Sequence, residues 1–335
     1  MSRTYTRPRW LKIALALAVF ASLLPFGVPG HAQISALDHP DQPTFVVPGV
    51  SPQQELRILV YGDMRFTNPS NTRATNPRAR KWLAEKVGTE HTDAMLITGD
   101  IPFHGSDPRD WAVFEREASS WARGTRVYPT IGNHELRSDP RPGQVNWAAA
   151  FPHLMGNGFY SVLLGNVFIV NLNSTEPMWP TGQQSDWLRA QLDHIPQQAD
   201  FVILQMHVPL IADTQSEFIA NIPAPESVAL RRYLETRAQT SRQKFIAVYG
   251  HIHNYERFEF NGITHIISGG GGAAPYPVFV RGPQDKYRDP GFPVFNYVIL
   301  TIHGKTADGT MYKIADPKAA QYSVVAKDHF IETGQ

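Results

Sequence analysis

The sequence predicts an α/β fold in which two mixed β-sheets pack as a sandwich flanked by helices. In the first half and the middle of the chain, apolar strand-like runs alternate with helix-like stretches, which is the pattern of strands joined by crossover helices. From Phe245 onward convincing helices are lacking, and strands follow one another with turns between them. A mixed two-sheet sandwich with outer helices accommodates both halves. The chain contains no internal repeat.

The first 32 residues indicate a signal peptide rather than a folded element. A basic head precedes the apolar stretch Ile13–Phe26, and a small-x-small cleavage site ends at Ala32. The apolar stretch is shorter than the ~20 residues of a spanning helix, and Pro25 interrupts it, so a membrane anchor is the weaker interpretation. We therefore expect an exported protein, periplasmic or extracellular, with no membrane anchor after cleavage.

Composition limits the possible partners. The 31 basic and 30 acidic residues become 27 and 30 after cleavage, which is a formal charge of −3. No basic block survives, so nothing predicts nucleic-acid binding by charge. The absence of cysteine excludes disulfides and thiolate metal ligands. The remaining length is enough for one large domain with a deep core.

The elements follow in order after a leader. Residues 33–54, rich in Pro and Ser, are predicted to lie over the domain or to stay loose, the domain to span 55–320, and a C-terminal tail to follow at 321–335. Runs rich in β-branched and aromatic residues predict strands at Leu56–Tyr61, Ala94–Thr98, Val127–Ile131, Phe159–Leu172, Phe201–His207, Lys244–Tyr249, Ile263–Ser268 and Tyr297–His303. Apolar spacing of three and four residues predicts helices at Asn76–Val87, Arg109–Ala122, Gln183–His194 and Glu226–Ala238. In the first helix, Pro77 at the start and Gly88 after the end are in their expected places.

Taken one at a time, polar residues after strands have ordinary structural explanations. A lone Gly-Asp after a strand is most often a turn, and a lone buried His is most often a core residue. The run Gly269–Gly272 lacks the Lys-Ser or Lys-Thr of a phosphate-binding loop, so we interpret it as a tight turn that lets the backbone approach a site.

Five short segments nevertheless share a pattern that single motifs lack, because each ends a predicted strand in a metal-seeking side chain. They are YGDMR, TGDIPFHG, IGNHE, QMHVP and YGHIHNYER, and they supply Asp63, Asp100, Asn133, His134, His207, His251 and His253. Strand ends of α/β sheets converge on a common crevice. Carboxylate, amide oxygen and imidazole are the ligand types that hold divalent or trivalent ions, so the combination predicts a paired metal site.

With these motifs in this order, the chain resembles the calcineurin-like metallophosphoesterases and is most similar to the purple acid phosphatases among them. The resemblance covers Tyr61 to about Gly272. It implies the four-layer α/β/β/α fold, two metal ions (iron, manganese or zinc) and a small-molecule phosphate ester as substrate. The implied activity is that of an acid phosphatase-like phosphomonoesterase using a metal-bridging hydroxide.

The resemblance also implies a role for each motif residue. Asp100 would bridge the two metals and His134 would protonate the leaving group, while the remaining ligands divide between the metals: Asp63 and His253 to the first, and Asn133, His207 and His251 to the second.

Two positions depart from the family pattern. Arg65 and Phe103 stand where members carry a ligating His or Tyr, and neither can ligate a metal. The neighbouring His104 could turn inward instead. Arg65 is interpreted as a phosphate clamp, with a salt bridge to a nearby carboxylate as the alternative.

Other functions remain open from the sequence alone. The same metal core serves phosphodiesterases and nucleotide pyrophosphatases, and Trp179 and Phe218 could line a pocket for a base or cover the core. The altered first-metal site also allows an inactive metal-binding envelope protein.

Overall fold

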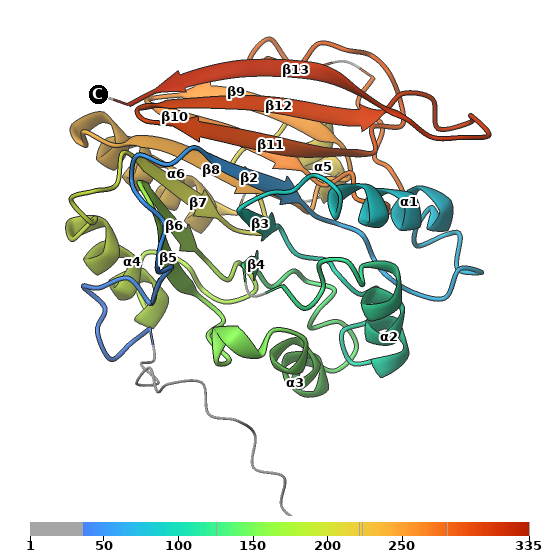
Figure 1. Cartoon of the computed structure of the whole chain (residues 1–335), viewed down its shortest axis with the longest axis horizontal. Coiled ribbons are helices and arrows are strands. Elements are labelled where there is room, and N and C mark those ends of the chain that lie inside the picture. The colour runs from blue at the N-terminus through green and yellow to red at the C-terminus, as the bar shows by residue number, and fades with distance from the viewer. Residues whose placement is uncertain (1–35, 125, 221, 223, 280, 335) are drawn as a thin grey trace, which may run out of the picture. The chain divides into compact units, whose positions relative to one another are not determined.

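The computed structural model describes residues 36–124, 126–220, 222, 224–279 and 281–334, so the predicted signal peptide at 1–32 lies outside the described residues. Two mixed β-sheets form the centre of the fold (Figure 1). The first sheet has the strand order β1-β5-β6-β7-β8-β10-β9. Its strands are β1 (Phe45–Val46), β5 (Tyr160–Leu164), β6 (Val167–Asn171), β7 (Phe201–Gln205), β8 (Lys244–Tyr249), β9 (Tyr255–Phe260) and β10 (Ile263–Ser268).

The second sheet has the order β13-β12-β11-β2-β3-β4. It contains β2 (Leu56–Tyr61), β3 (Ala94–Ile97), β4 (Val127–Pro129), β11 (Asn296–His303), β12 (Thr306–Ile314) and β13 (Val324–Thr333). The strands β2, β3 and β4 run parallel in this sheet, and β6, β7 and β8 run parallel in the first sheet. Both parallel groups therefore present several carboxyl ends at one edge, where α/β sheets gather functional side chains.

Helices cover the outer faces of the sandwich, as the sequence predicts. They are α1 (Pro77–Val87), α2 (Pro108–Glu117), α3 (Pro140–Ala150), α4 (Gln183–Asp193), α5 (Thr214–Ala220) and α6 (Pro225–Thr240). Side chains of β6 point alternately to the two sides of the first sheet. Val167 and Ile169 belong to the apolar cluster that includes the second sheet. Phe168 and Val170 belong to the cluster that includes α4 and α6. The predicted α/β fold with two mixed sheets is confirmed.

Local signals account for most element ends. Asn76 caps α1 by accepting a hydrogen bond from the backbone N–H of Ala79, and Pro77 is its first residue. The predicted strand Phe159–Leu172 is two strands, β5 and β6, separated at Gly165, whose φ of 56° favours glycine. The predicted helix Arg109–Ala122 ends earlier, at Glu117.

Residues on both sides of the predicted domain, 55–320, pair with its strands. The residues expected as a C-terminal tail include β13, which pairs with β12 from Val324 to Thr333 and so belongs to the sheet. In the predicted leader, β1 pairs with β5, and Gln191 of α4 donates to the carbonyls of Pro40 and Gln42, so this segment lies over the domain. Long-range backbone pairing of this kind leaves little trace in the local sequence.

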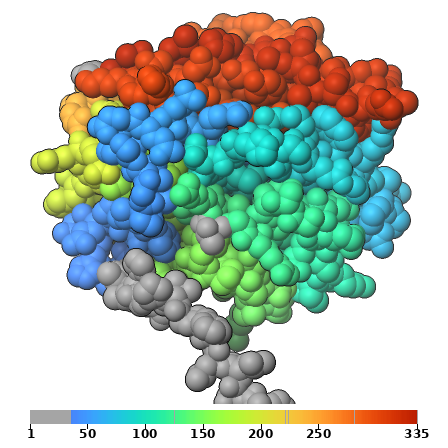
Figure 2. All heavy atoms as spheres, viewed as in Figure 1, coloured from blue at the N-terminus to red at the C-terminus, as the bar shows by residue number. Residues whose placement is uncertain are grey.

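The loop between β12 and β13 contacts α1. Arg78 of α1 donates to the carbonyl of Ala319, and Trp82 packs edge-on against Tyr322. In Figure 2 the red C-terminal part of the chain borders the cyan part that contains α1. No helix within the described part of the chain has the length and apolarity needed to cross a membrane.

Candidate metal centre

The six predicted ligands follow strand ends of both sheets. Asp63, Asp100 and Asn133 follow the adjacent strands β2, β3 and β4, and the three histidines follow β7 and β8 of the other sheet. The structure brings all six together: Asp63 accepts from the backbone N–H of His251 at 2.9 Å, and Asn133 Oδ1 lies 3.1 Å from His207 Nε2. The cluster therefore joins the carboxyl ends of the two sheets.

The backbone is strained at several of these positions. Asp63, Asp100 and His251 have φ values of 58°, 54° and 69°, in the left-handed region that favours glycine. Such conformations cost of order 1–3 kcal/mol each and persist where the surrounding structure enforces them. They turn each chain sharply at the strand end, so that the side chain projects into the shared crevice.

Close backbone approach is a second local requirement. A Cβ on Gly132 would lie 2.5 Å from Asp100 Oδ1, and one on Gly250 would lie 2.5 Å from Asp63 Oδ2. The run Gly269–Gly272 also approaches the site, since a Cβ on Gly269 would lie 2.9 Å from Asp63 Oδ2. The predicted close approach of this run's backbone to the site is confirmed.

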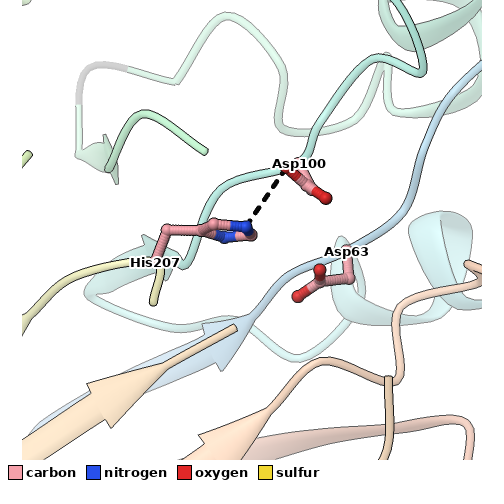
Figure 3. A group of neighbouring side chains, drawn as sticks. All are labelled: Asp63, Asp100 and His207. Atoms are coloured by element: carbon pink, nitrogen blue, oxygen red, sulfur yellow. Dashed lines mark ion pairs between the residues drawn. The ribbon is translucent and has the colours of Figure 1, made fainter. Parts of the chain in front are cut away.

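Four atoms that could ligate a metal lie close together, and we call this place the second metal position. His207 Nε2 lies 3.2 Å from Asp100 Oδ1, the pair joined by the dashed line in Figure 3. His251 Nδ1 lies 3.2 Å from both His207 Nε2 and Asn133 Oδ1. His207 Nδ1 lies 2.8 Å from the Thr98 carbonyl, to which only an N–H can donate, so Nε2 of the neutral ring carries a bare lone pair. Lone pairs facing one another at this spacing fit a cation.

A candidate first metal position lies between Asp63 and His253. His253 Nδ1 donates to the Ala274 carbonyl at 2.6 Å, which leaves Nε2 as the bare nitrogen. This Nε2 is buried without a hydrogen-bond partner and lies 3.6 Å from Asp63 Oδ1. A buried acceptor with no donor is costly unless a cation binds it. With Asp100, the position offers three protein ligands.

Electrostatics at the two carboxylates are opposed. Burial raises the pKa of Asp63 well above its usual range, and the neighbouring charge of Asp100 adds to this effect. Burial acts in the same direction on Asp100, but His207, His134 and Arg65 outweigh it and hold the Asp100 pKa below its usual range. Two buried carboxylates are held ionised together only if positive charge compensates them.

Arg65 supplies part of that positive charge. Its Nη2 and Nε lie 3.1 Å and 3.3 Å from Asp100 Oδ2, and its side chain is 13% exposed. The predicted alternative of a salt bridge is thus present in this state. His104 does not join the metal ligands, because it lies 3.8 Å from Asp110 and packs against Phe103.

His134 lies beside the metal ligands with both ring nitrogens engaged. Nδ1 donates to the Phe103 carbonyl at 2.6 Å, and Nε2 lies 3.2 Å from Arg137 Nη1. Burial lowers the His134 pKa to about 4, so the ring is neutral near pH 7. The Glu135 carboxylate, next along the chain, accepts from the backbone N–H groups of Asp100, Ile101 and Gly132.

The two aromatic residues that the sequence left open have different surroundings. Trp179 stacks on Tyr233 at 4.3 Å and carries Arg189 over its face, so it covers packed structure. Phe218 is 88% exposed on α5.

Sequence reasoning missed two residues of the site. Tyr276 stacks on His253 at 4.1 Å and hydrogen-bonds Arg65, but nothing in its local sequence marks it. Arg137 carries a positive charge three residues after His134, and this short spacing could have indicated that the two side chains lie close together.

Comparisons with known proteins agree with this arrangement. A family model described as calcineurin-like phosphoesterase matches residues 56–255. The chain is 26% identical over 188 residues to purple acid phosphatase 21 of Arabidopsis thaliana, covering 52% of this chain and 41% of that protein. It is 23% identical over 244 residues to the probable inactive purple acid phosphatase 9 of the same plant, covering 61% of this chain and 37% of that protein. The chain spans less than half the length of these curated relatives.

Solved structures show the same fold at lower identity. A purple acid phosphatase from yellow lupin (Lupinus luteus) seeds matches with a TM-score of 0.65 and 19% identity, over 84% of this chain and 55% of that one. The Plasmodium inner-membrane-complex anchor GAP50 matches with a TM-score of 0.56 and 12% identity, over 82% of this chain and 89% of that one.

Proposed function

Because this chain belongs to the calcineurin-like phosphoesterase family, we propose that it is a metal-dependent hydrolase of phosphate esters, with a phosphomonoester as substrate. The observation that carries the proposal is the convergence of Asp100 Oδ1, Asn133 Oδ1 and His207 Nε2, all acceptors, on one point with His251 Nδ1. Carboxylate, amide and imidazole ligand atoms gathered at this spacing are typical of a cation site.

The residues fit two metal ions. Asp100, Asn133, His207 and His251 would hold one, and Asp63, Asp100 and His253 would hold the other, where the bare Nε2 of His253 supports the assignment. Bound metals would supply Lewis acidity and a water of lowered pKa. The ligand types suit iron, manganese or zinc alike.

The chain's own residues would bind and orient the ester. Arg65 has N–H groups beyond those on Asp100, and these can hold a phosphate oxygen beside the carboxylate. His134 lies 3.9 Å from Asp100 Oδ2 and is the candidate proton donor to the leaving oxygen. That role stays a prediction, since Nε2 of the neutral ring accepts from Arg137 in this state.

The decisive experiment combines metal analysis with a substrate screen. We expect two metals per chain in protein purified from its native compartment, and faster turnover of p-nitrophenyl phosphate than of bis-p-nitrophenyl phosphate. Asp100→Asn should lose paired metal and at least about 100-fold in kcat/KM, because this side chain serves both positions. Full metal content and activity in this variant would overturn the proposal.

The principal alternative is a phosphodiesterase or nucleotide pyrophosphatase on the same site, which faster diester turnover would establish. A second alternative, an inactive metal-binding envelope protein, is favoured by the Arg65–Asp100 ion pair and by the relative named as probably inactive. One tightly held metal with no ester hydrolysis would establish that case.

Export to the periplasm or the extracellular space is part of the proposal. It rests on the basic head and apolar stretch within residues 1–32. N-terminal sequencing of the native protein should begin near Gln33.

A further inference from the structure

Arg137 is a cation at the site that the proposed chemistry has not yet used. It follows β4 in the same turn as Asn133, and its side chain is exposed. Its Nη1 lies 3.2 Å from His134 Nε2, and its guanidinium carbon lies 4.8 Å from the centre of the Phe103 ring. No carboxylate of the described residues forms an ion pair with it, unlike Arg65 on Asp100.

The hydrogen-bond roles around His134 are fixed by chemistry. A guanidinium can only donate, so His134 Nε2 accepts from Arg137, while Nδ1–H donates to the Phe103 carbonyl. A neutral imidazole is a weak partner for a guanidinium. A phosphate oxyanion makes charge-assisted hydrogen bonds roughly twice as strong as neutral ones, so an arriving phosphate would take this donor from His134.

Phe103 cannot ligate a metal, but its ring contacts both Arg137 and His134. Its ring lies under the Arg137 guanidinium and 5.2 Å from the His134 ring, so it acts as a platform for both. Cation–π contacts at exposed sites contribute about 0.5–1 kcal/mol, enough to bias the long side chain toward the site.

We propose that Arg137 binds a terminal oxygen of the substrate phosphate, opposite Arg65, and makes the site selective for monoester dianions. The inference rests on the proposed phosphoesterase function and names its substrate class. A monoester presents three terminal oxygens and close to two negative charges, whereas a diester presents two oxygens and one charge. Two guanidinium groups flanking His134 and Asp100 therefore match the monoester better.

The test uses the metal-loaded protein and three variants: Arg137→Ala, Arg137→Lys and Arg141→Ala. Arg141→Ala is the matched control, because it removes the same charge from the exposed start of α3 without touching His134. Inorganic phosphate affinity is measured by isothermal titration calorimetry, and kcat/KM is measured for p-nitrophenyl phosphate and bis-p-nitrophenyl phosphate.

We expect Arg137→Ala to weaken phosphate binding roughly 10- to 100-fold, and to lower monoester kcat/KM by a similar factor but diester kcat/KM less than about 3-fold. Arg137→Lys should recover part of the loss, and Arg141→Ala should match wild type. Unchanged phosphate affinity in Arg137→Ala, or equal losses for both esters, would overturn the inference. If the wild type hydrolyses no ester, the proposed function fails, and the phosphate titration alone still decides the role of Arg137.

Discussion

At the scale of single residues, this site is held by backbone conformations as much as by side chains. Asp63, Arg65, Asp100 and His251 all have positive φ, which non-glycine residues rarely adopt. The tautomers are likewise set by the backbone, because the carbonyls of Thr98 and Ala274 take the Nδ1–H of a histidine and leave its Nε2 facing the site. Such positioning costs folding stability, and it would prearrange the proposed metal ligands.

The Arg65→Ala variant tests the clamp against the salt bridge. If Arg65 holds phosphate, its removal should raise KM about 10-fold or more while metal content stays at the wild-type level. Metal content is measured by mass spectrometry, with the exposed Arg109→Ala as the control. Loss of metal with an unchanged KM would assign Arg65 to Asp100 alone.

The His134→Ala variant tests the proposed proton donor. A residue that protonates the leaving oxygen matters most when that oxygen is basic, so an alkyl phosphate should slow by at least about 10-fold more than p-nitrophenyl phosphate. Metal content should stay unchanged, since His134 is not a predicted ligand. Equal slowing of the two esters would exclude the acid role.

At the scale of elements, the turns after β3 and β4 form one interlocked unit. The buried Glu135 carboxylate accepts from the N–H groups of Asp100, Ile101 and Gly132, and the N–H of His134 donates to Asp100 Oδ1. The side chain of Asp100, the proposed bridging ligand, is therefore oriented by the neighbouring turn. This turn tolerates no added volume, because a Cβ on Gly132 would meet the Asp100 backbone nitrogen at 2.5 Å.

Gly132→Ala should accordingly destabilise the protein by about 1–3 kcal/mol and reduce metal content, because the added methyl group displaces Asp100. Denaturant unfolding and metal analysis measure the two effects. Gly158→Ala is the control, since its Cβ would meet atoms no closer than 3.5 Å. A Gly132→Ala protein with wild-type stability and metal content would contradict the interlocked arrangement.

At the scale of the whole described molecule, a buried acidic group joins α5 to the segment after β8. Glu256 accepts from the backbone N–H of Asp213 and from the hydroxyl of Ser216, and Asp213 accepts from the N–H of Gly282. Burial raises the pKa of both Asp213 and Glu256 to about 7, and a hydrogen bond to Asp285 adds to the shift of Asp213. These carboxyls are therefore protonated in the folded protein at mildly acidic pH.

Stability should consequently depend on pH in a defined direction. The pKa values of Asp213 and Glu256 in the folded protein lie above the usual values of 3.8 and 4.5. Their contribution to the free energy of unfolding is therefore full below about pH 4 and is lost as the pH rises through about 7. Asp213→Asn should flatten the decline in unfolding free energy between pH 5 and 8, by about 1–3 kcal/mol. A wild-type slope in Asp213→Asn, measured by urea unfolding, would contradict this.

The parts of the fold that sequence could predict are those with local patterns. The strand β2, the start of α1 at Pro77 and the glycine turns before Asp63 and Asp100 follow from residue type and spacing. By contrast, the pairing of β13 with β12 and the contact of Arg137 with His134 depend on partners that meet only after folding. The candidate ligands were predictable because each follows a strand end, whereas the tautomers and ion pairs that tune them required coordinates.

The arrangement of ligands on both sheets links metal affinity to thermal stability. A cation held by Asp100 after β3 and by His207 after β7 would tie the two layers of the sandwich, and it would bind only when they are assembled. Metal at 100 times its Kd would stabilise the fold by about 2.7 kcal/mol. We expect a chelator to lower the melting temperature and added metal to raise it again in steps. The number of equivalents needed for full recovery would then give the number of cations that bridge the layers.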